Sequence, residues 1–280
     1  MSEYNHKIEY MSDEEFRKRL EHKPRKQERN YSAYERLELG DLLCNEGKFE
    51  EAFAQYRKAV EMEKRNPGYH TRLGDAYAYS ENAIQALNEY KKAIKLSPRR
   101  AEPHFSLAEL YRRYGKWKAA ISEYRKSVKY NPQNPYYRYK LADSLWQIGE
   151  QEDAVLQMEI AVQIANSDAF YHFLLADMLW RVGRLSSAIN EMQQATIFCP
   201  VDAYYCFRLG LLYMLSHNCA EAVLAIRRAI HLEPDQRMFF AVLAEAYENL
   251  GDFSLSKKCA DIASSMSTFD IASLAVVRSK

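Results

Sequence analysis

Glycine and proline are scarce in this chain. Its 280 residues include nine glycines and eight prolines, too few for a fold of many tight turns and too few for a disordered chain. Hydrophobic residues make up 48% and charged residues 28%, which is the balance of a folded protein. The scarcity of turn-forming residues therefore favours a helical fold.

Cysteine is also sparse, and its spacing excludes two kinds of framework. The five cysteines are odd in number and none forms a CxxC pair, which fits neither a disulfide scaffold nor a zinc knuckle. We expect reduced and mostly buried thiols, and no metal or cofactor. The cysteines are Cys44, Cys199, Cys206, Cys219 and Cys259.

The chain lacks a net charge and any long apolar run. Its 39 Lys and Arg residues oppose 38 Asp and Glu residues, so a net charge of +1 gives no overall attraction to nucleic acid or membrane. No run of about 18 apolar residues occurs, and the start of the sequence has no apolar core of a secretion signal. We therefore expect a cytoplasmic protein without a transmembrane segment.

What the chain does have is a period of 34 residues. Small residues follow the repeated leucine, recur twelve residues later and recur again seven residues beyond that, always as Gly, Ala or Ser. Because helices approach each other closely only where side chains are small, each period predicts two packed antiparallel helices. The leucine occurs seven times, at Leu39, Leu73, Leu107, Leu141, Leu175, Leu209 and Leu243.

The few glycines and prolines fall where these helices are expected to end. A glycine tolerates the positive φ that ends the first helix, and a proline stops the second. The glycine is missing at Glu81 and His217, and the proline at Asn166 and Thr268. The terminating residues are Gly47, Gly115, Gly149, Gly183 and Gly251, and Pro98, Pro132, Pro200 and Pro234.

The pattern L-[GA]-x-x-[YL]-x-x-x-G-x-φ-x-x-A-x-x-x-Y-x-x-A, followed by Pro, resembles the tetratricopeptide repeat family. The resemblance implies an all-α fold, a right-handed α-solenoid of seven antiparallel helix pairs. A charged arm with a short helix near 13–22 is expected over 1–32, and a tail over 271–280. The repeats are expected at 33–66, 67–100, 101–134, 135–168, 169–202, 203–236 and 237–270.

The resemblance also implies where a partner binds. In the family, positions 2, 5, 9 and 12 of the first helix line a concave groove that binds extended peptides or helices. Here, in repeats 3 to 6, aromatic residues fill much of this stripe, and such residues are common anchors of protein interfaces. The alternative is that the rings pack on one another between repeats. The candidate groove residues are Phe105, Tyr136, Tyr139, Asp143, Trp146, Phe170, Phe173, Asp177, Trp180, Tyr204, Phe207 and Met214.

Position 9 is acidic in six of the seven repeats. Carboxylates beside aromatic rings would select a partner segment that carries Lys or Arg. Alternatively, these carboxylates keep the groove solvated and pair with basic residues of position 6, such as Arg72, Lys140 and Arg208. The acidic residues are Asp41, Asp75, Glu109, Asp143, Asp177 and Glu245.

Basic residues are concentrated between positions 91 and 129, where twelve stand against three acidic residues. We expect a basic outer patch on repeats 2 and 3. It is either a solvated face or a surface for an acidic subunit, RNA or anionic lipid. The patch consists of Lys91, Lys92, Lys95, Arg99, Arg100, Arg112, Arg113, Lys116, Lys118, Arg125, Lys126 and Lys129.

No catalytic constellation is found. His70, His104 and His172 recur at position 4 because one helix face repeats, so they are expected in separate layers. The sequence has no phosphate-binding glycine loop, nucleophile elbow or HExxH motif. The basic clamp with which some family members bind chaperone C-terminal carboxylates is absent, because its places hold Leu37, Asp41, Thr71, Arg72, Glu102 and Ser106.

We therefore expect a non-catalytic scaffold or complex-assembly factor that holds a partner protein in the groove of repeats 3 to 6. Two alternatives stay open. One is binding of nucleic acid or an anionic surface through the basic patch. The other is a structural accessory subunit that docks into a larger complex or associates with itself.

Overall fold

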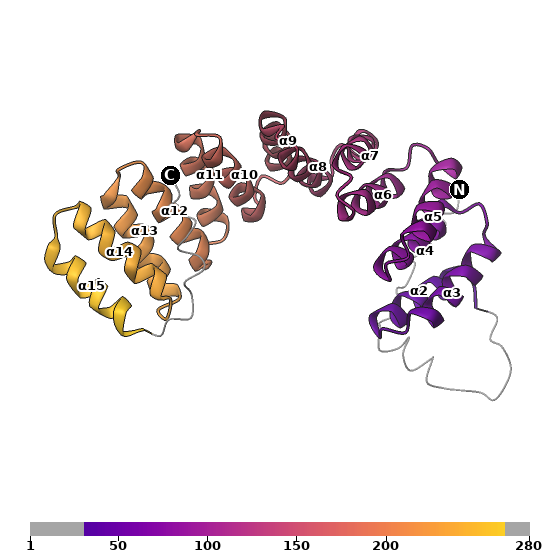
Figure 1. Ribbon diagram of the computed structural model, residues 1–280, viewed down its shortest axis with the longest axis horizontal. Helices are drawn as coiled ribbons and strands as arrows, with labels where there is room; N and C mark the ends of the chain where they lie inside the picture. Colours follow the sequence, from indigo (N-terminus) through magenta and orange to yellow (C-terminus); the bar gives the residue numbers. More distant parts are fainter. Residues whose placement is uncertain (1–30, 267–280) are drawn as a thin grey trace, which may run out of the picture. The chain divides into compact units, whose positions relative to one another are not determined.

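The computed structural model describes residues 31–266 of the chain. The short helix expected near 13–22, the tail 271–280 and the last residues of the seventh repeat lie outside this range. The chain divides into two compact units, 1–64 and 65–280. The described part of the first unit holds the helices α2 and α3, and that of the second holds α4 to α15 (Figure 1).

Every regular element in the described range is an α-helix. Short first helices and short second helices alternate along the chain, and each first helix begins at the first residue of an expected repeat. The helices are α2 (Ala33–Asn45), α3 (Phe49–Met62), α4 (Pro67–Tyr79), α5 (Ala83–Leu96), α6 (Ala101–Arg113), α7 (Trp117–Tyr130), α8 (Pro135–Gln147), α9 (Gln151–Ile164), α10 (Ala169–Arg181), α11 (Leu185–Phe198), α12 (Ala203–Leu215), α13 (Cys219–Leu232), α14 (Arg237–Asn249) and α15 (Phe253–Ser265).

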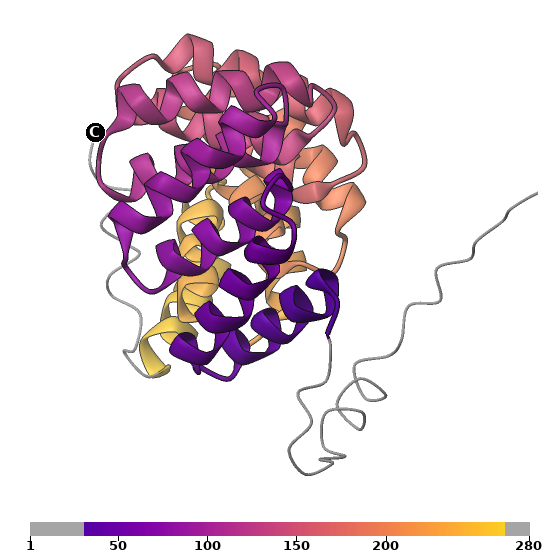
Figure 2. The same ribbon diagram turned by 90° about the vertical axis from the view of Figure 1, so that its right-hand side faces the viewer.

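Consecutive helices pair as hairpins, α2 with α3 in the first unit and α4 with α5 through α14 with α15 in the second. Within the second unit each second helix also packs against the first helix of the next hairpin. First helices of neighbouring hairpins meet as well, α4 with α6 and α12 with α14. Figure 2 shows the same helices from a second direction. The expected all-α solenoid of helix pairs is confirmed.

Local sequence sets where the first helices begin. Asn66, Asn134, Asp168 and Asp202 precede α4, α8, α10 and α12, and each side chain accepts a hydrogen bond from a backbone N–H of the first turn. Ser32 and Glu35 form a capping box at the start of α2. These bonds satisfy N–H groups that have no partner within the helix, which fixes the start of these five hairpins, whereas α6 and α14 begin without a side-chain cap.

The two helices of a hairpin approach most closely at small residues. The alanines that begin the contact on the second helix are fully buried from Ala52 to Ala222. On the first helix, a Cβ added to Gly74 would lie 2.6 Å from Cε1 of Tyr90, and one added to Gly210 would lie 2.5 Å from Cγ1 of Ile226. The close approach therefore leaves no room for a side chain at these two glycines.

We predict that Gly74→Leu lowers the free energy of unfolding by about 1 to 3 kcal/mol, because the side chain must displace the Tyr90 ring. The measurement is the midpoint of thermal unfolding followed by circular dichroism. Ser122→Leu, on the exposed side of α7, is the control and should leave the midpoint nearly unchanged. An unchanged midpoint for Gly74→Leu would contradict this packing.

The loop between the two helices of a hairpin turns on one residue with positive φ. Five hairpins use glycine there, with φ between 66° and 83°. Glu81, at φ 64°, and His217, at φ 58°, adopt the same backbone conformation without glycine. The sequence departs from the repeat at these two positions, but the backbone keeps its turn.

Glu81→Gly and His217→Gly are each expected to raise the free energy of unfolding by about 0.5 kcal/mol. A side chain in the left-handed region is strained, and relief of that strain exceeds the entropy that glycine adds to the unfolded chain. Urea unfolding tests this. Gly149→Ala, the reverse change in an equivalent loop at φ 83°, should destabilise; stabilisation by it, or destabilisation by both glycine variants, would refute the explanation.

Candidate partner-binding surfaces

The aromatic stripe of the first helices contains two kinds of ring. Position 2 carries rings that are largely exposed, with 44% of Tyr136, 42% of Phe170 and 47% of Tyr204 accessible to solvent. Position 5 carries rings that pack between hairpins. Phe207, the position-5 ring of α12, is only 2% exposed and lies 4.6 Å from Phe239.

Each position-5 ring contacts the first helix of the next hairpin. Phe105 stacks on Tyr137 at a centroid distance of 4.5 Å, and Phe173 stacks on Tyr205 at 5.2 Å. Tyr139 meets Phe170 edge to face at 5.8 Å. Packing between repeats, the alternative raised from the sequence, therefore accounts for these rings, while the position-2 rings remain exposed.

Sequence reasoning missed the position-3 tyrosines. Tyr137 and Tyr171 are buried and Tyr205 is half-buried. Tyr137 and Tyr205 stack on rings of the preceding first helix, and Tyr171 meets Phe170 of its own helix. Burial raises the pKa of each phenol above its ordinary value. The signal was available, because position 3 is tyrosine in three consecutive repeats.

Two cations of position 6 already lie on the aromatic stripe. Nζ of Lys140 is 5.3 Å from the ring centroids of both Tyr136 and Tyr139, and 4.0 Å from the Glu109 carboxylate. In α12, Arg208 lies over Trp180 at 5.5 Å, and its Nη2 donates to Asp177 at 2.7 Å. Each cation thus pairs with the position-9 carboxylate of the preceding hairpin. This agrees with the alternative that these carboxylates pair with basic residues of position 6.

Position 9 has a further partner inside the earlier hairpins. The hydroxyl of Tyr56 donates to Asp41 at 2.6 Å and that of Tyr90 to Asp75 at 2.8 Å, and Tyr124 donates to Glu109 in the same way. Burial and the neighbouring carboxylates raise the pKa of these phenols.

In α9 and α11 the place of this tyrosine is taken by Met158 and Met192, which are fully buried. Asp143 and Asp177 therefore lack the internal phenol. Asp177 pairs instead with Arg181 and Arg208, whereas Asp143 has no ion pair with any residue in the described range. Trp146, Trp180 and Met214, at position 12, are half-buried.

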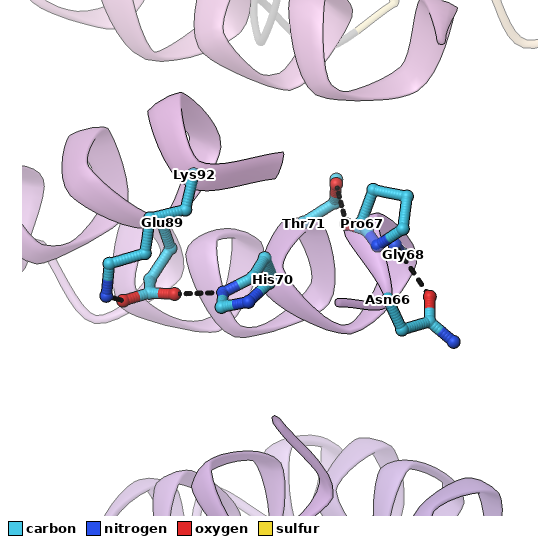
Figure 3. Close-up of polar contacts among 7 residues, drawn as sticks. All are labelled: Asn66, Pro67, Gly68, His70, Thr71, Glu89 and Lys92. Atoms are coloured by element: carbon cyan, nitrogen blue, oxygen red, sulfur yellow. Dashed lines mark hydrogen bonds and ion pairs between the residues drawn. The ribbon is translucent and has the colours of Figure 1, made fainter. Parts of the chain in front are cut away.

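The three recurrent histidines each pair with a glutamate nineteen residues later, on the second helix of the same hairpin. Nδ1 of His70 lies 2.7 Å from Glu89, whose other carboxylate oxygen accepts from Lys92 at 2.6 Å (Figure 3). His104 pairs with Glu123 at 2.6 Å and His172 with Glu191 at 2.7 Å.

These pairs bury charge at the hairpin contact. Burial alone would raise the pKa of Glu89 and of Glu123, but hydrogen bonds from the histidine and a lysine outweigh it and hold both pKa values below the usual range. Because the folded-state pKa is lowered, this stabilisation is present at neutral pH and is lost as the pH falls through the folded-state value.

Other hairpins fill the same two positions with other matched pairs. Nη1 of Arg36 donates to Gln55 at 3.0 Å, and Nη1 of Arg138 donates to Gln157 at 3.1 Å. Arg138 also reproduces the second contact of the histidines, since its Nε donates to the carbonyl of Pro132, six residues earlier, as His104 contacts that of Pro98. The histidines are therefore one solution of a repeated structural pair and lie in separate hairpins.

We predict that the double variant His172→Arg with Glu191→Gln keeps the wild-type free energy of unfolding within about 0.5 kcal/mol, since it recreates the Arg138–Gln157 pair. Glu191→Leu alone should cost about 1 to 3 kcal/mol, because it leaves a buried ring nitrogen without its partner. Urea unfolding of both variants is the measurement. Equal destabilisation by the two would show that the pair is not interchangeable.

The basic patch is partly neutralised by neighbours. Six of its residues have a carboxylate or carbonyl partner: Lys92, Arg100, Arg112, Arg113, Arg125 and Lys126. The other six have no ion pair within the described range: Lys91, Lys95, Arg99, Lys116, Lys118 and Lys129. Arg112 and Arg113 lie on the first helix α6, whereas the patch on α5 and α7 points outward.

Between residues 31 and 266, no group of three or more His, Cys, Asp or Glu side chains is placed to hold a metal ion. No helix in that range is long and apolar enough to cross a membrane. All five cysteines are free thiols.

This arrangement defines the class of protein as an α-solenoid of helical hairpins with chemically different faces. Family models described as "TPR repeat" match residues 40–79 and 109–149, and one described as "Tetratricopeptide repeat" matches 67–100. The chain therefore contains tetratricopeptide repeats, and the resemblance stated from its sequence is confirmed.

Solved structures share this fold. The crystal structure of the MamA protein is 23% identical over 58% of this chain and 89% of that chain, with a TM-score of 0.54. YrrB, described as "a TPR protein with an unusual peptide-binding site", is 21% identical over 66% of this chain and 95% of its own, with a TM-score of 0.56. A chain of the APC/C hetero-tetramer Cut9–Hcn1 is 17% identical over 77% of this chain and 43% of its own length, with a TM-score of 0.53. No curated protein sequence matches the chain.

Proposed function

We propose that this protein is a non-catalytic interaction scaffold or complex-assembly factor that binds a partner segment in the concave groove of repeats 3 to 6. Tetratricopeptide repeats generally mediate protein–protein interaction, and YrrB, a protein of similar fold, is described by its peptide-binding site. The observation that carries the proposal is the row of exposed rings Tyr136, Phe170 and Tyr204, one on each of α8, α10 and α12.

Neighbouring side chains support these rings. Tyr136 lies 5.6 Å from Phe105, Phe170 lies 5.8 Å from Tyr139, and Tyr204 lies 5.7 Å from Phe173. Each exposed ring thus rests on a half-buried ring of the preceding hairpin. Rings held in place lose little rotamer entropy when a partner covers them, which makes them effective anchors.

The charges of the groove refine the partner's chemistry. Lys140 and Arg208 already neutralise Glu109 and Asp177, so a partner gains little from placing a cation there. Asp143 is the exception among these three carboxylates. We therefore infer a partner segment with apolar or aromatic side chains opposite the exposed rings and a Lys or Arg opposite Asp143.

The free cysteines fit a reducing compartment, and a cytoplasmic setting is part of the proposal. Self-association and a role as an accessory subunit are compatible with the same groove, because a second copy or a larger complex is also a protein partner. The experiment below distinguishes the groove from the other surfaces.

The triple variant Tyr136→Ala, Phe170→Ala, Tyr204→Ala is expected to lose partner binding, since truncating an interface anchor costs about 1 kcal/mol or more at each site. The three side chains are exposed, so helical content should not change. Quantitative affinity capture from cells that make the protein compares this variant with the wild type.

The control is a second triple variant, Leu156→Ala, Ile197→Ala, Leu224→Ala, which removes side chains that are at least as exposed on second helices of the same hairpins. Partners that the wild type and the control capture should be missing from the groove variant. If the groove variant captures the same partners in the same amounts, the proposed site is wrong.

A further inference from the structure

The outward faces of the neighbouring second helices α7 and α9 carry charges of opposite sign. On α7 the outward face carries Lys118, Arg125 and Lys129, all exposed and with no carboxylate among them. On α9 the equivalent face carries Glu152 and Glu159. Both of these glutamates pair with Arg184, and on the positive side Arg125 pairs with Glu150 while Lys118 and Lys129 have no ion pair within residues 31–266.

A pocket of about 330 Å³ lies at this boundary. Arg125 and Lys129 line it from α7, and Asp153 and Gln157 line it from α9. Its floor comes from α8, which contributes Arg138, Leu141 and Leu145, and Val128 of α7 adds a further apolar side chain. The pocket thus offers one ligand apolar side chains, three cationic groups and a single carboxylate, Asp153.

The cation in the floor lacks a charged partner. Arg138 donates to the Gln157 amide at 3.1 Å and to the Pro132 carbonyl at 3.2 Å, both neutral acceptors. In the hairpins before and after, the position-4 residue faces a carboxylate, as in His104–Glu123 and His172–Glu191.

The two rim cations differ. Arg125 forms a 3.7 Å ion pair with Glu150 in which both side chains are about half exposed, and Lys129 has no ion pair within residues 31–266. Burial lowers the pKa of Arg138, which reflects an uncompensated charge that a nearby carboxylate would stabilise.

We propose that the groove between α7 and α9 binds an acidic segment of a partner polypeptide, with one carboxylate directed at Arg125, Lys129 and Arg138. Its walls are second helices, and its floor residue Arg138 is at position 4 of α8, on nearly the opposite side of that helix from positions 2 and 5, so it is separate from the first-helix groove of the proposed function. A scaffold with both surfaces holds two segments at once.

The same geometry favours a polypeptide over a polyanion. The basic surface of α5 and α7 ends at this groove, because Asp153, Glu152 and Glu159 follow directly on its other wall, α9. A nucleic-acid backbone or an anionic vesicle presents a continuous negative surface that would meet these carboxylates. A peptide presents single carboxylates beside neutral side chains, which matches a groove that is basic on one side only.

The test is fluorescence anisotropy with a short fluorescein-labelled peptide rich in glutamate and leucine, titrated with the full-length protein. The double variant Arg125→Ser with Lys129→Ser should weaken binding about fivefold or more, the sum expected for two ion pairs at a protein surface. Arg138→Gln should weaken it as well. The matching peptide with glutamine in place of glutamate should bind much more weakly than the glutamate peptide.

The matched control is Lys91→Ser with Lys95→Ser, which removes the same charges from the equivalent repeat positions on α5. There the His104–Glu123 pair occupies the place that Arg138 and Gln157 take in the groove, so binding should stay near the wild-type value. The triple variant of Tyr136, Phe170 and Tyr204 should also bind this peptide normally, which separates the two surfaces.

Three results would overturn the proposal. The first is equal weakening by the α5 and α7 double variants, which would indicate attraction to net charge alone. The second is equal affinity for the glutamate and glutamine peptides. The third is tighter binding, through the same α7 residues, to single-stranded polyuridine or to phosphatidylserine vesicles than to the glutamate peptide.

Discussion

The close approach of the two helices in each hairpin constrains everything else in this fold. The contacting alanines of the second helix are fully buried, and a Cβ added to Gly40, Gly74 or Gly210 of the first helix would collide with Tyr56, Tyr90 or Ile226 of the second. The helices are therefore held at a fixed separation, and the same positions face the partner helix in every repeat. The constant repeat length of 34 residues, without insertions, is consistent with this fixed separation. Positions away from the contact are free to vary, and the chemistry of the two surfaces is found there.

Polar contacts within the hairpins change as matched sets on this constant frame. At positions 4 and 23 a histidine faces a glutamate or an arginine faces a glutamine, and both sets bond to the same carbonyl of the preceding loop. At position 9 a buried tyrosine holds the carboxylate in three hairpins. Where methionine replaces that tyrosine, Asp143 and Asp177 have no phenol partner inside the hairpin, and Asp177 pairs instead with Arg181 and Arg208.

Much of the fold could be predicted from the sequence, because the small residues of the helix contact and the residue that makes the turn recur at the same positions in the repeats. The candidate groove could be predicted only in part. Periodicity placed Phe207 on the same stripe as Tyr204, but contact with Phe239 buries the former and leaves the latter exposed. A pattern within one repeat does not show what the next repeat covers. For the same reason, the sequence alone did not decide whether Lys140 and Arg208 pair with carboxylates of the preceding hairpin. The His–Glu pairs left a readable signal, since positions 4 and 23 change together along the chain.

The central claim is that the exposed position-2 rings, rather than the equally exposed residues of the second helices, meet the partner. Site-specific photo-crosslinking tests it most directly, with a photoreactive phenylalanine analogue placed singly at 136, 170 and 204, and singly at 156, 197 and 224. The account predicts that the first three positions crosslink to one partner and that the second three do not crosslink to it. Crosslinks to that partner from the second set alone would contradict the account.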